Sequence, residues 1–279
     1  MPLPLLWPDT ARIDTLANPA RDAIAVYLLE LDIPAPLASL PRYLSYLGDA
    51  EGERKRAMRP GRGQWQYLQS RVLRRVVLSA YAGCAPDRLR FARDRWGRAR
   101  LLGQDPLHFS LSHCASHVAL AVGSSAMLGI DVATVFPARP HFMRIAQDHF
   151  AAADLAQLEA CPSGRRYYRF LELWTLKQAY LKAVPPRSAR PLASCTFSWT
   201  GAGVLVCDDH EALPALERPD AFVSQQWVNT CQLGLAFRSG LPVSYRYLNG
   251  SGPGQIWPHT QTGDSHAWDA DRGSQLLPS

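Results

Sequence analysis

The apolar residues of this chain change their spacing several times, and such a chain must combine strands with helices. An apolar, β-prone run spans 23–31 and is bounded by Pro34 and Pro36, which predicts a strand. Apolar side chains recur at helical spacing over 64–82, with arginines between them, which predicts an amphipathic helix. Further along we expect a hairpin broken at Gly97 within 89–102, strands at 107–111, 118–122 and 127–132, helices within 139–183, and short strands from Ala193 to about Leu248.

Composition sets the class of protein. The chain has 279 residues and 47% hydrophobic content, enough to fill the core of one large domain or two small ones. No stretch approaches the roughly 18 consecutive apolar residues of a membrane span, and no basic segment precedes an apolar run at the start, so we expect a cytoplasmic protein with no membrane partner. The six cysteines form no C-x-x-C pair, which favours free thiols over a zinc cluster or a disulfide framework.

Positive charge is concentrated in one part of the chain. Residues 51–100 hold fourteen Arg or Lys and four Asp or Glu, a net charge of +10, although the whole chain carries only +6. The window predicts an anion-binding surface, and a solvated basic helix face is the simpler alternative. Nucleic acid is a third possible partner, but the sequence has no helix-turn-helix, zinc-finger or ribonucleoprotein motif, so we expect none.

Two short segments carry polar side chains at the ends of expected strands. The basic turn Trp96-Gly97-Arg98-Ala99-Arg100 has side chains that can reach a phosphate, but such turns are common in an arginine-rich chain. Leu111-Ser112-His113 precedes Gly129-Ile130-Asp131, where a carboxylate at the end of an apolar strand costs free energy unless it is paired or binds a metal. A partly buried structural histidine and a capping aspartate are the alternatives for His113 and Asp131.

A third segment is the expected helix over 170–183. Leu171, Trp174, Gln178 and Leu181 fall on one stripe of this helix, and Lys182 lies one turn after Gln178. Polar side chains on the inward-facing stripe of a helix need a polar partner or a function. The alternative is that Lys182 extends toward solvent while Gln178 bonds a backbone group.

Together these segments resemble a known family. Leu111-Ser112-His113, Gly129-Ile130-Asp131 and Trp174-Thr175-Leu176-Lys177-x-Ala179-Tyr180-Leu181-Lys182-Ala183 are similar, in this order, to motifs of the Sfp-type 4′-phosphopantetheinyl transferases. Trp96-Gly97-Arg98-Ala99 looks like the Tyr-Gly-Lys-Pro turn of that family, with Arg98 in the lysine position. The resemblance runs from about residue 23 to 245.

The resemblance implies an α+β fold of two similar α/β halves with pseudo-twofold symmetry, usually in a monomer. The halves would span 23–125 and 126–248, between an irregular extension at 1–22 and a disordered tail at 249–279. It implies a holo-[acyl-carrier-protein] synthase reaction, in which the 4′-phosphopantetheine arm of coenzyme A moves to a serine of an acyl or peptidyl carrier protein. Mg²⁺ would be the cofactor.

The resemblance also implies roles for particular residues. Asp131 would bind Mg²⁺ together with Gln178, and Lys182, Gln178 and Asp154 would be the catalytic residues. The residues implied to bind coenzyme A are Arg54, Lys55, Arg56, Arg98, Ser112, His113 and Lys177.

This sequence departs from the family pattern at several positions. Ala133 and Gln178 stand where the family commonly has acidic residues, and an amide brings no negative charge and accepts no proton. The glycine-rich turn after the lysine helix is replaced by residues 184–190, which include two prolines, so this loop must run differently. Asp154 resembles a family glutamate that could compensate, whereas Glu172 should point away from Gln178. Two hypotheses follow: an active transferase, or an impaired member that binds coenzyme A or a carrier protein as a regulatory module.

Overall fold

A computed structural model describes most of the chain between residues 23 and 248. The described residues are 23–31, 40–95, 97–104, 107–136, 138–184, 190–200, 205–210, 214, 218–227, 231–248 and 256–257. The expected extension at 1–22, Trp96, the prolines of the 184–190 loop and most of the expected tail lie outside this part of the chain. Within it, no helix is both long and apolar enough to cross a membrane.

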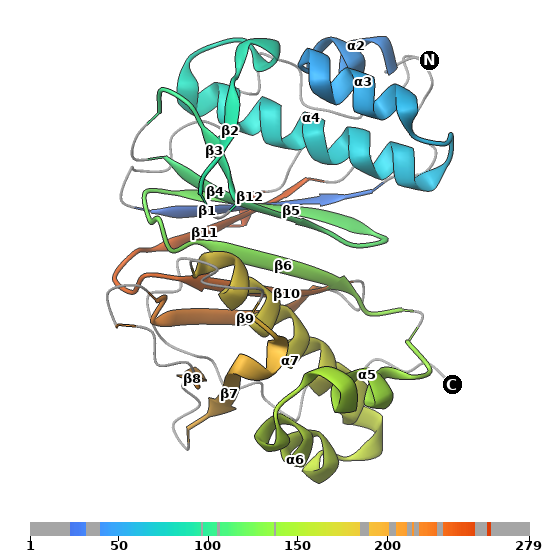
Figure 1. Ribbon diagram of the computed structural model, residues 1–279, viewed down its shortest axis with the longest axis vertical. Coiled ribbons are helices and arrows are strands. Elements are labelled where there is room, and N and C mark those ends of the chain that lie inside the picture. The colour runs from blue at the N-terminus through green and yellow to red at the C-terminus, as the bar shows by residue number, and fades with distance from the viewer. Residues whose placement is uncertain are drawn as a thin grey trace.

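The fold is a mixed α+β arrangement of two sheets and two long helices (Figure 1). The first sheet has the strand order β12-β11-β1-β5-β4, and the second has the order β6-β10-β9. Their strands are β1 (Ile24–Glu30), β4 (His108–His113), β5 (His117–Gly123), β6 (Gly129–Thr134), β9 (Ala221–Trp227), β10 (Cys231–Phe237), β11 (Val243–Leu248) and β12 (Ile256–Trp257). The helices are α2 (Leu40–Ser45), α3 (Asp49–Ala57), α4 (Arg62–Ala82), α5 (Phe142–His149), α6 (Ala152–Ala160) and α7 (Ser163–Ala183).

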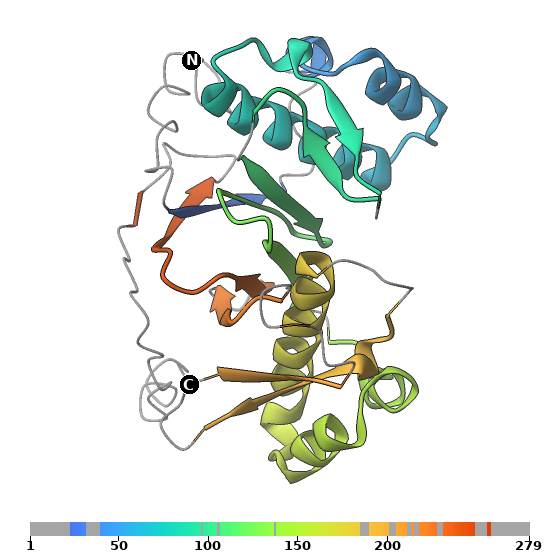
Figure 2. The ribbon, with the colours of Figure 1, turned by 60° about the vertical axis from the view of Figure 1, so that its left-hand side comes forward.

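Four layers result, because each sheet is covered on its outer face by one long helix. Helix α4 lies on the first sheet and α7 on the second, with the sheets facing each other in the middle (Figures 1 and 2). Two hairpins flank this body: β2 (Phe91–Arg93) with β3 (Ala99–Leu101), and β7 (Cys195–Trp199) with β8 (Leu205–Asp209). Gly97 has a φ of 83° in the first hairpin, at the break that the sequence predicts.

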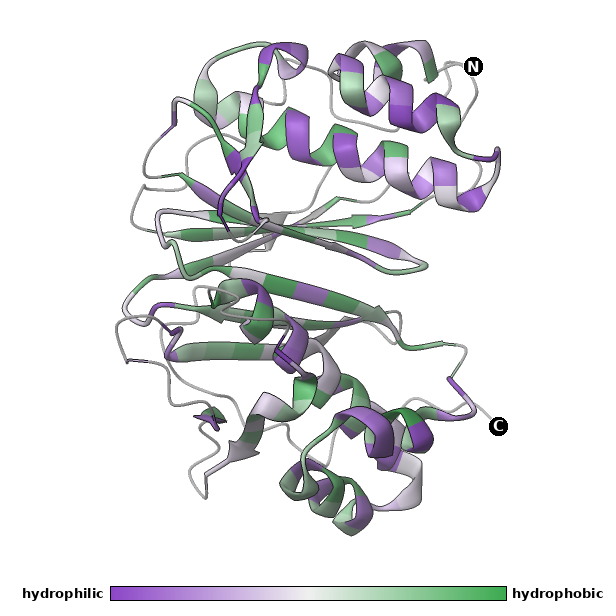
Figure 3. Cartoon of the chain, viewed as in Figure 1, coloured by the Kyte–Doolittle hydropathy of each residue, from purple (hydrophilic) through white to green (hydrophobic). Residues whose placement is uncertain are grey.

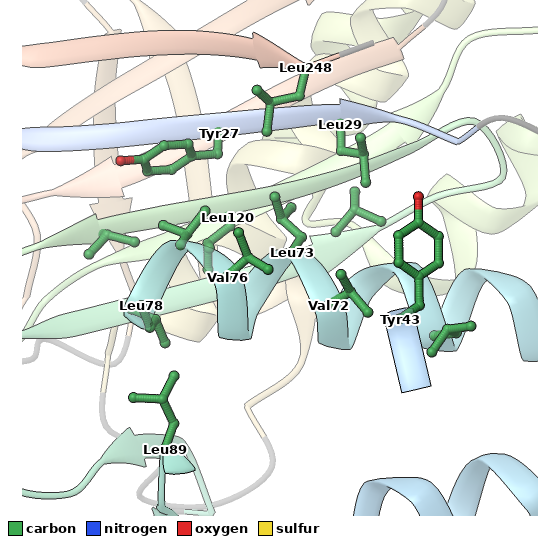
Figure 4. Close-up of a cluster of buried hydrophobic side chains, with 14 of the residues drawn as sticks. Tyr27, Leu29, Tyr43, Val72, Leu73, Val76, Leu78, Leu89, Leu120 and Leu248 are labelled. Atoms are coloured by element: carbon green, nitrogen blue, oxygen red, sulfur yellow. The ribbon is translucent and has the colours of Figure 1, made fainter. Parts of the chain in front are cut away.

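Strand β1 is buried on both faces, which explains why its sequence is apolar throughout and does not alternate. Ala25, Tyr27 and Leu29 belong to the core cluster under α4 (Figure 4). Ile24, Val26 and Leu28 belong to the cluster between the two sheets. Figure 3 shows the contrast with α3, whose residues are mostly hydrophilic.

Strand β11 returns to the first sheet and pairs in parallel with β1, with Ile24 opposite Val243 and Leu29 opposite Leu248. The first sheet therefore contains the strand expected to end the C-terminal half, whereas all strands of the second sheet come from residues 129–237. Ile256–Trp257, inside the segment expected to be disordered, pairs antiparallel with β11 because that strand offers a free edge.

Two glycines allow α7 to approach the second sheet closely. A Cβ atom on Gly129 of β6 would lie 1.9 Å from the carbonyl oxygen of Ala179. One on Gly234 of β10 would lie 2.4 Å from the carbonyl carbon of Thr175. Gly234 is paired with Asp131 in the sheet register, and Asp131 shares a face of β6 with Gly129. The side chain of Asp131 therefore faces α7.

Candidate functional site

Three polar side chains from separate segments meet where the two sheets adjoin. Ser112 at the end of β4 donates a hydrogen bond from Oγ to Oδ1 of Asp131 over 2.7 Å. Lys182, in the last turn of α7, places Nζ 2.7 Å from the same oxygen and 3.0 Å from the carbonyl oxygen of Ile130. The two strands are joined at this level, because the backbone N–H of Ile130 donates to Oγ of Ser110 over 3.1 Å. These contacts define the seam site: Ser112, Asp131 and Lys182.

His113 lies beside the seam site and is partly exposed to solvent. Desolvation of the imidazole lowers its pKa, and the positive charges of Arg71 and Lys182 lower it further against the opposing effect of Asp131. The ring is therefore neutral near pH 7 in the unliganded protein. The same interactions show that Arg71 of α4 and Lys182 of α7 both act on this position.

Arg71 is a site candidate that the sequence patterns did not single out. Its guanidinium carbon lies 4.9 Å from the centre of the Tyr67 ring, and that of Arg54 lies 5.9 Å from the same ring. Tyr67 thus connects an exposed arginine of α3 with one that acts on His113. The spacing of four residues between Tyr67 and Arg71, one turn of a helix, is the signal that could have identified the pair.

The rest of the basic window divides into structural and exposed residues. Arg74 and Arg75 are buried and paired with Glu51, so they stabilise the contact between α3 and α4 and are closed to ligands. Burial lowers the pKa of Arg74 to about 10, and Glu51 opposes that shift. Lys55 is half-buried and Arg56 is exposed on α3.

Arg98 lies close to the seam site, but its contacts are within the protein. Its Nε atom is 2.9 Å from Oδ2 of Asp94, and its Nη1 atom donates to the carbonyl oxygen of Ala183 over 3.2 Å. Ala183 is the last residue of α7, directly after Lys182. Arg98 therefore ties the first hairpin to the end of the helix that carries Lys182, whereas the resemblance implies that it binds coenzyme A.

Asp154 and Lys177 lie in the core and not at the seam site, although the resemblance implies a catalytic role for Asp154 and coenzyme A binding for Lys177. Both side chains are fully buried, and Nζ of Lys177 lies 2.7 Å from Oδ2 of Asp154. Nζ also donates to the carbonyl oxygens of Leu192, over 3.0 Å, and of Cys195. Five positions on a helix rotate a side chain by about 140°, so Lys177 and Lys182 face different directions. The structure places Asp154 and Lys177 together inside the core around α7, apart from the seam site.

The two positions that depart from the family pattern lie on the two elements that carry Asp131 and Lys182. Gln178 is half-buried and lies one helical turn before Lys182, on the same side of α7. Ala133 is buried two residues after Asp131 on β6. Glu172, in contrast, pairs with Arg169 over 3.1 Å. Desolvation raises the pKa of Glu172 while Arg169 and Arg165 oppose the shift.

The oxygen ligands at the seam site fit one mode of magnesium binding. Among the described residues no group of three His, Cys, Asp or Glu side chains could hold a metal, so an all-protein cage is not formed there. Oδ1 of Asp131 accepts from Ser112 and Lys182, and no hydrogen bond from the described residues reaches Oδ2. Mg²⁺ commonly keeps several waters and takes one or two carboxylates together with substrate phosphates. Asp131, with the amide oxygen of Gln178 one turn from Lys182, fits that mode.

Comparisons with known proteins repeatedly return one superfamily. A model of the 4′-phosphopantetheinyl transferase superfamily matches residues 127–231, which include Asp131 and all of α7. The 4′-phosphopantetheinyl transferase psf-1 of Bacillus pumilus is 28% identical over 63% of this chain and 73% of its own length. For Sfp of Bacillus subtilis the identity is 24%, over 61% of this chain and 74% of the relative.

Other relatives are matched over less of their length. An L-aminoadipate-semialdehyde dehydrogenase-phosphopantetheinyl transferase of Eremothecium gossypii is 32% identical over 54% of this chain, but only 55% of that protein is covered. A relative from Synechocystis is covered over 61% of its length. A mixed α+β protein with a carboxylate, a lysine and a serine at its seam thus matches one superfamily repeatedly. The 4′-phosphopantetheinyl transferase superfamily is therefore the family that this chain resembles.

Proposed function

We propose that this protein transfers the 4′-phosphopantetheine group of coenzyme A to a serine of an acyl or peptidyl carrier protein, with Mg²⁺ as cofactor. The observation that carries the proposal is the seam site, where Asp131 lies 2.7 Å from Lys182 and accepts a hydrogen bond from Ser112. Sequence similarity supports the reaction, since the relatives named above are 4′-phosphopantetheinyl transferases.

Positive charge around the seam site supports coenzyme A as the donor. Coenzyme A carries a diphosphate and a 3′-phosphate, and Arg71, Lys182 and the N–H groups of His113 can hold such oxygens. Tyr67 places Arg54 beside Arg71, so we assign Arg54 to the far phosphate in preference to Lys55 and Arg56. Typical carrier proteins are acidic and would be attracted by the same surface.

The transfer breaks the phosphoanhydride bond within the diphosphate of coenzyme A and forms a phosphate ester to the carrier serine. The carrier serine oxygen attacks the phosphorus attached to the pantetheine arm, and adenosine 3′,5′-bisphosphate leaves. Lys182 can stabilise or protonate the departing phosphate, because its ammonium group is held by Asp131 and the carbonyl of Ile130. Mg²⁺, when bound, supplies neutralisation of the diphosphate charge. The serine proton passes to Asp131 or to water, since Gln178 cannot accept it.

The structure also leads us to assign other residues a supporting role. Asp154 and Lys177 hold the core around α7, so we propose that neither contacts coenzyme A. Arg98 holds the end of α7 and thereby positions Lys182.

We further propose that the molecule is a monomer of two similar halves with pseudo-twofold symmetry. Helices α4 and α7 support this, since each has 21 residues and covers the outer face of one sheet (Figure 2). The halves would correspond to 23–125 and 126–248, with β11 exchanged into the first sheet.

A second function is favoured by one observation. Ala133 and Gln178 bring no carboxylate, so Asp131 supplies the negative charge of the seam site by itself. A member with too little negative charge to complete the reaction could still bind coenzyme A or a carrier protein and serve as a regulatory module. Nothing in this alternative changes the assignment of Arg71 and His113 to the phosphates.

A mass-spectrometric assay separates the two functions. Purified protein, Mg²⁺, coenzyme A and a panel of apo carrier proteins are incubated, and the carriers are weighed. Transfer adds about 340 Da, the mass of one phosphopantetheine group. A gain that a chelator abolishes supports the transferase. No gain on any carrier, with coenzyme A still raising the melting temperature, supports the binding module.

A further inference from the structure

The seam site has little negative charge of its own. The side chain of Asp131, its carboxylate residue, is only 11% exposed and already lies 2.7 Å from the ammonium group of Lys182. A lysine at this distance neutralises the carboxylate that a metal ion would use. A divalent cation entering alone must therefore either displace Lys182 or share Asp131 with it.

The surroundings add more positive charge. Arg71 and Lys182 both act on the His113 ring, as the electrostatics of that ring show. Two acidic side chains of the basic window 51–100 are already engaged: Asp94 with Arg98, and Glu51 with Arg74 and Arg75. Like charges that converge in a partly desolvated site repel a free cation strongly.

The polar group on the same side of α7, one turn before Lys182, is the neutral amide of Gln178. Its oxygen can bind a metal ion but cannot offset the charge of Lys182. Lys182 is also held by the carbonyl oxygen of Ile130, over 3.0 Å, so it is anchored at the carboxylate by two contacts.

We propose that this chain binds a divalent cation only together with a diphosphate-bearing ligand, and that the neutral side chain of Gln178 sets this dependence. The inference rests on the proposed function, in which that ligand is coenzyme A. A diphosphate brings the missing negative charge and additional oxygen ligands, and it gives Lys182 and Arg71 an anionic partner. The free protein keeps Lys182 on Asp131 and leaves the cation in solution.

The test measures binding of Mn²⁺ by electron paramagnetic resonance, in which bound Mn²⁺ loses its sharp free-ion signal. Four conditions are compared: protein alone, protein with coenzyme A, protein with adenosine 3′,5′-bisphosphate, and coenzyme A without protein. The bisphosphate is the matched ligand, because it keeps the 3′-phosphate and lacks the diphosphate. We expect protein and coenzyme A together to bind Mn²⁺ at least about ten-fold more tightly than protein alone, protein with the bisphosphate, or free coenzyme A.

A pair of variants isolates the role of Gln178. Gln178→Glu adds one negative charge beside Lys182, and we expect it to bind Mn²⁺ without any ligand, at least about ten-fold more tightly than the wild type. Glu172→Gln is the control on the same helix, where the charge change faces Arg169. It should leave Mn²⁺ binding unchanged, and circular dichroism of both variants checks that they fold.

The outcomes separate the inference from the proposed function. Mn²⁺ binding that is equally tight with and without coenzyme A overturns the inference, provided that coenzyme A raises the melting temperature. An unchanged Mn²⁺ affinity in Gln178→Glu overturns the role of Gln178. Because coupled binding is reciprocal, failure of coenzyme A to shift the melting temperature both with and without Mn²⁺ counts against the proposed function itself, and with it the inference.

Discussion

Helix α7 carries two lysines that each pair with an aspartate of another element. The two pairs have the same separation but different surroundings. Lys177 and Asp154 lie 2.7 Å apart with neither side chain exposed, and the lysine is fixed further by two backbone carbonyls. Lys182 and Asp131 also lie 2.7 Å apart, but 33% and 11% of their side chains remain exposed. A buried pair is closed to ligands and serves the fold, whereas a partly exposed pair can exchange its partner for a substrate.

The sharpest way to break this comparison is to remove one partner from the buried pair. Lys177→Met leaves the Asp154 carboxylate buried without its cation, and we expect a loss of about 3–5 kcal/mol in the free energy of unfolding. Urea denaturation measures it. The double variant Lys177→Met with Asp154→Leu should recover most of the loss, and failure to recover would show that the pair stabilises the fold by more than charge compensation.

Removing the lysine of the partly exposed pair should affect the transfer rate strongly and the stability weakly. Lys182→Ala should lower the transfer rate by at least about 100-fold, because the departing phosphate loses its cation. Its free energy of unfolding should fall by no more than about 1 kcal/mol, since the pair is partly solvated. Carrier mass spectrometry and urea denaturation on the same sample measure both quantities. A stability loss as large as that of Lys177→Met would contradict the distinction.

A substitution outside both pairs tests how α7 is positioned. Gly234→Ala places a Cβ atom 2.4 Å from the backbone of Thr175, so α7 must shift away from β10. We expect about 1–3 kcal/mol of destabilisation and a slower transfer, since Lys182 moves with the helix. Gly164→Ala is the control on α7, where an added Cβ meets no atom within 4 Å. Equal thermal shifts in both variants would show that the close approach matters little.

The smallest expected effect is the pH dependence contributed by His113. Desolvation, Arg71 and Lys182 lower its pKa, so the unfolded chain binds more protons than the folded one between the folded pKa and the ordinary value of about 6.5. Stability should therefore fall as the pH drops below about 6.5. Bound phosphate raises the pKa of the ring, so His113 should strengthen coenzyme A binding at about pH 6 relative to pH 8 by a few-fold at most.

The variant His113→Gln checks this pH effect by difference. The phosphates of coenzyme A also titrate in this range, but that contribution is common to wild type and variant. Calorimetric affinities at the two pH values should show a larger ratio for the wild type. Identical ratios would mean that His113 does not contact the phosphates.

Local structure was largely predictable because its signals are local. The expected helix at 64–82 forms as Arg62–Ala82, and the expected strand at 23–31 forms as Ile24–Glu30. The expected hairpin turns at Gly97. The region expected to be helical, 139–183, contains α5, α6 and α7. Hydrophobic spacing and turn residues are sufficient for each of these.

What the sequence did not reveal depends on contacts between distant segments. The parallel pairing of β11 with β1 joins residues more than two hundred positions apart, and no local pattern specifies it. The burial of Lys177 with Asp154 was equally hidden, since a lysine within a motif of site residues looks like part of the site. The resemblance named Ser112, Asp131 and Lys182, and the structure brings these three together.

The central claim is that Asp131 and Lys182 form a site for phosphopantetheine transfer, separate from the buried pair on the same helix. The most direct measurement weighs one apo carrier protein after incubation with Mg²⁺, coenzyme A and either the wild type or Asp131→Ala. We predict that the wild type adds about 340 Da and that the variant, though folded, adds nothing. Transfer by Asp131→Ala at the rate of the wild type would contradict the claim.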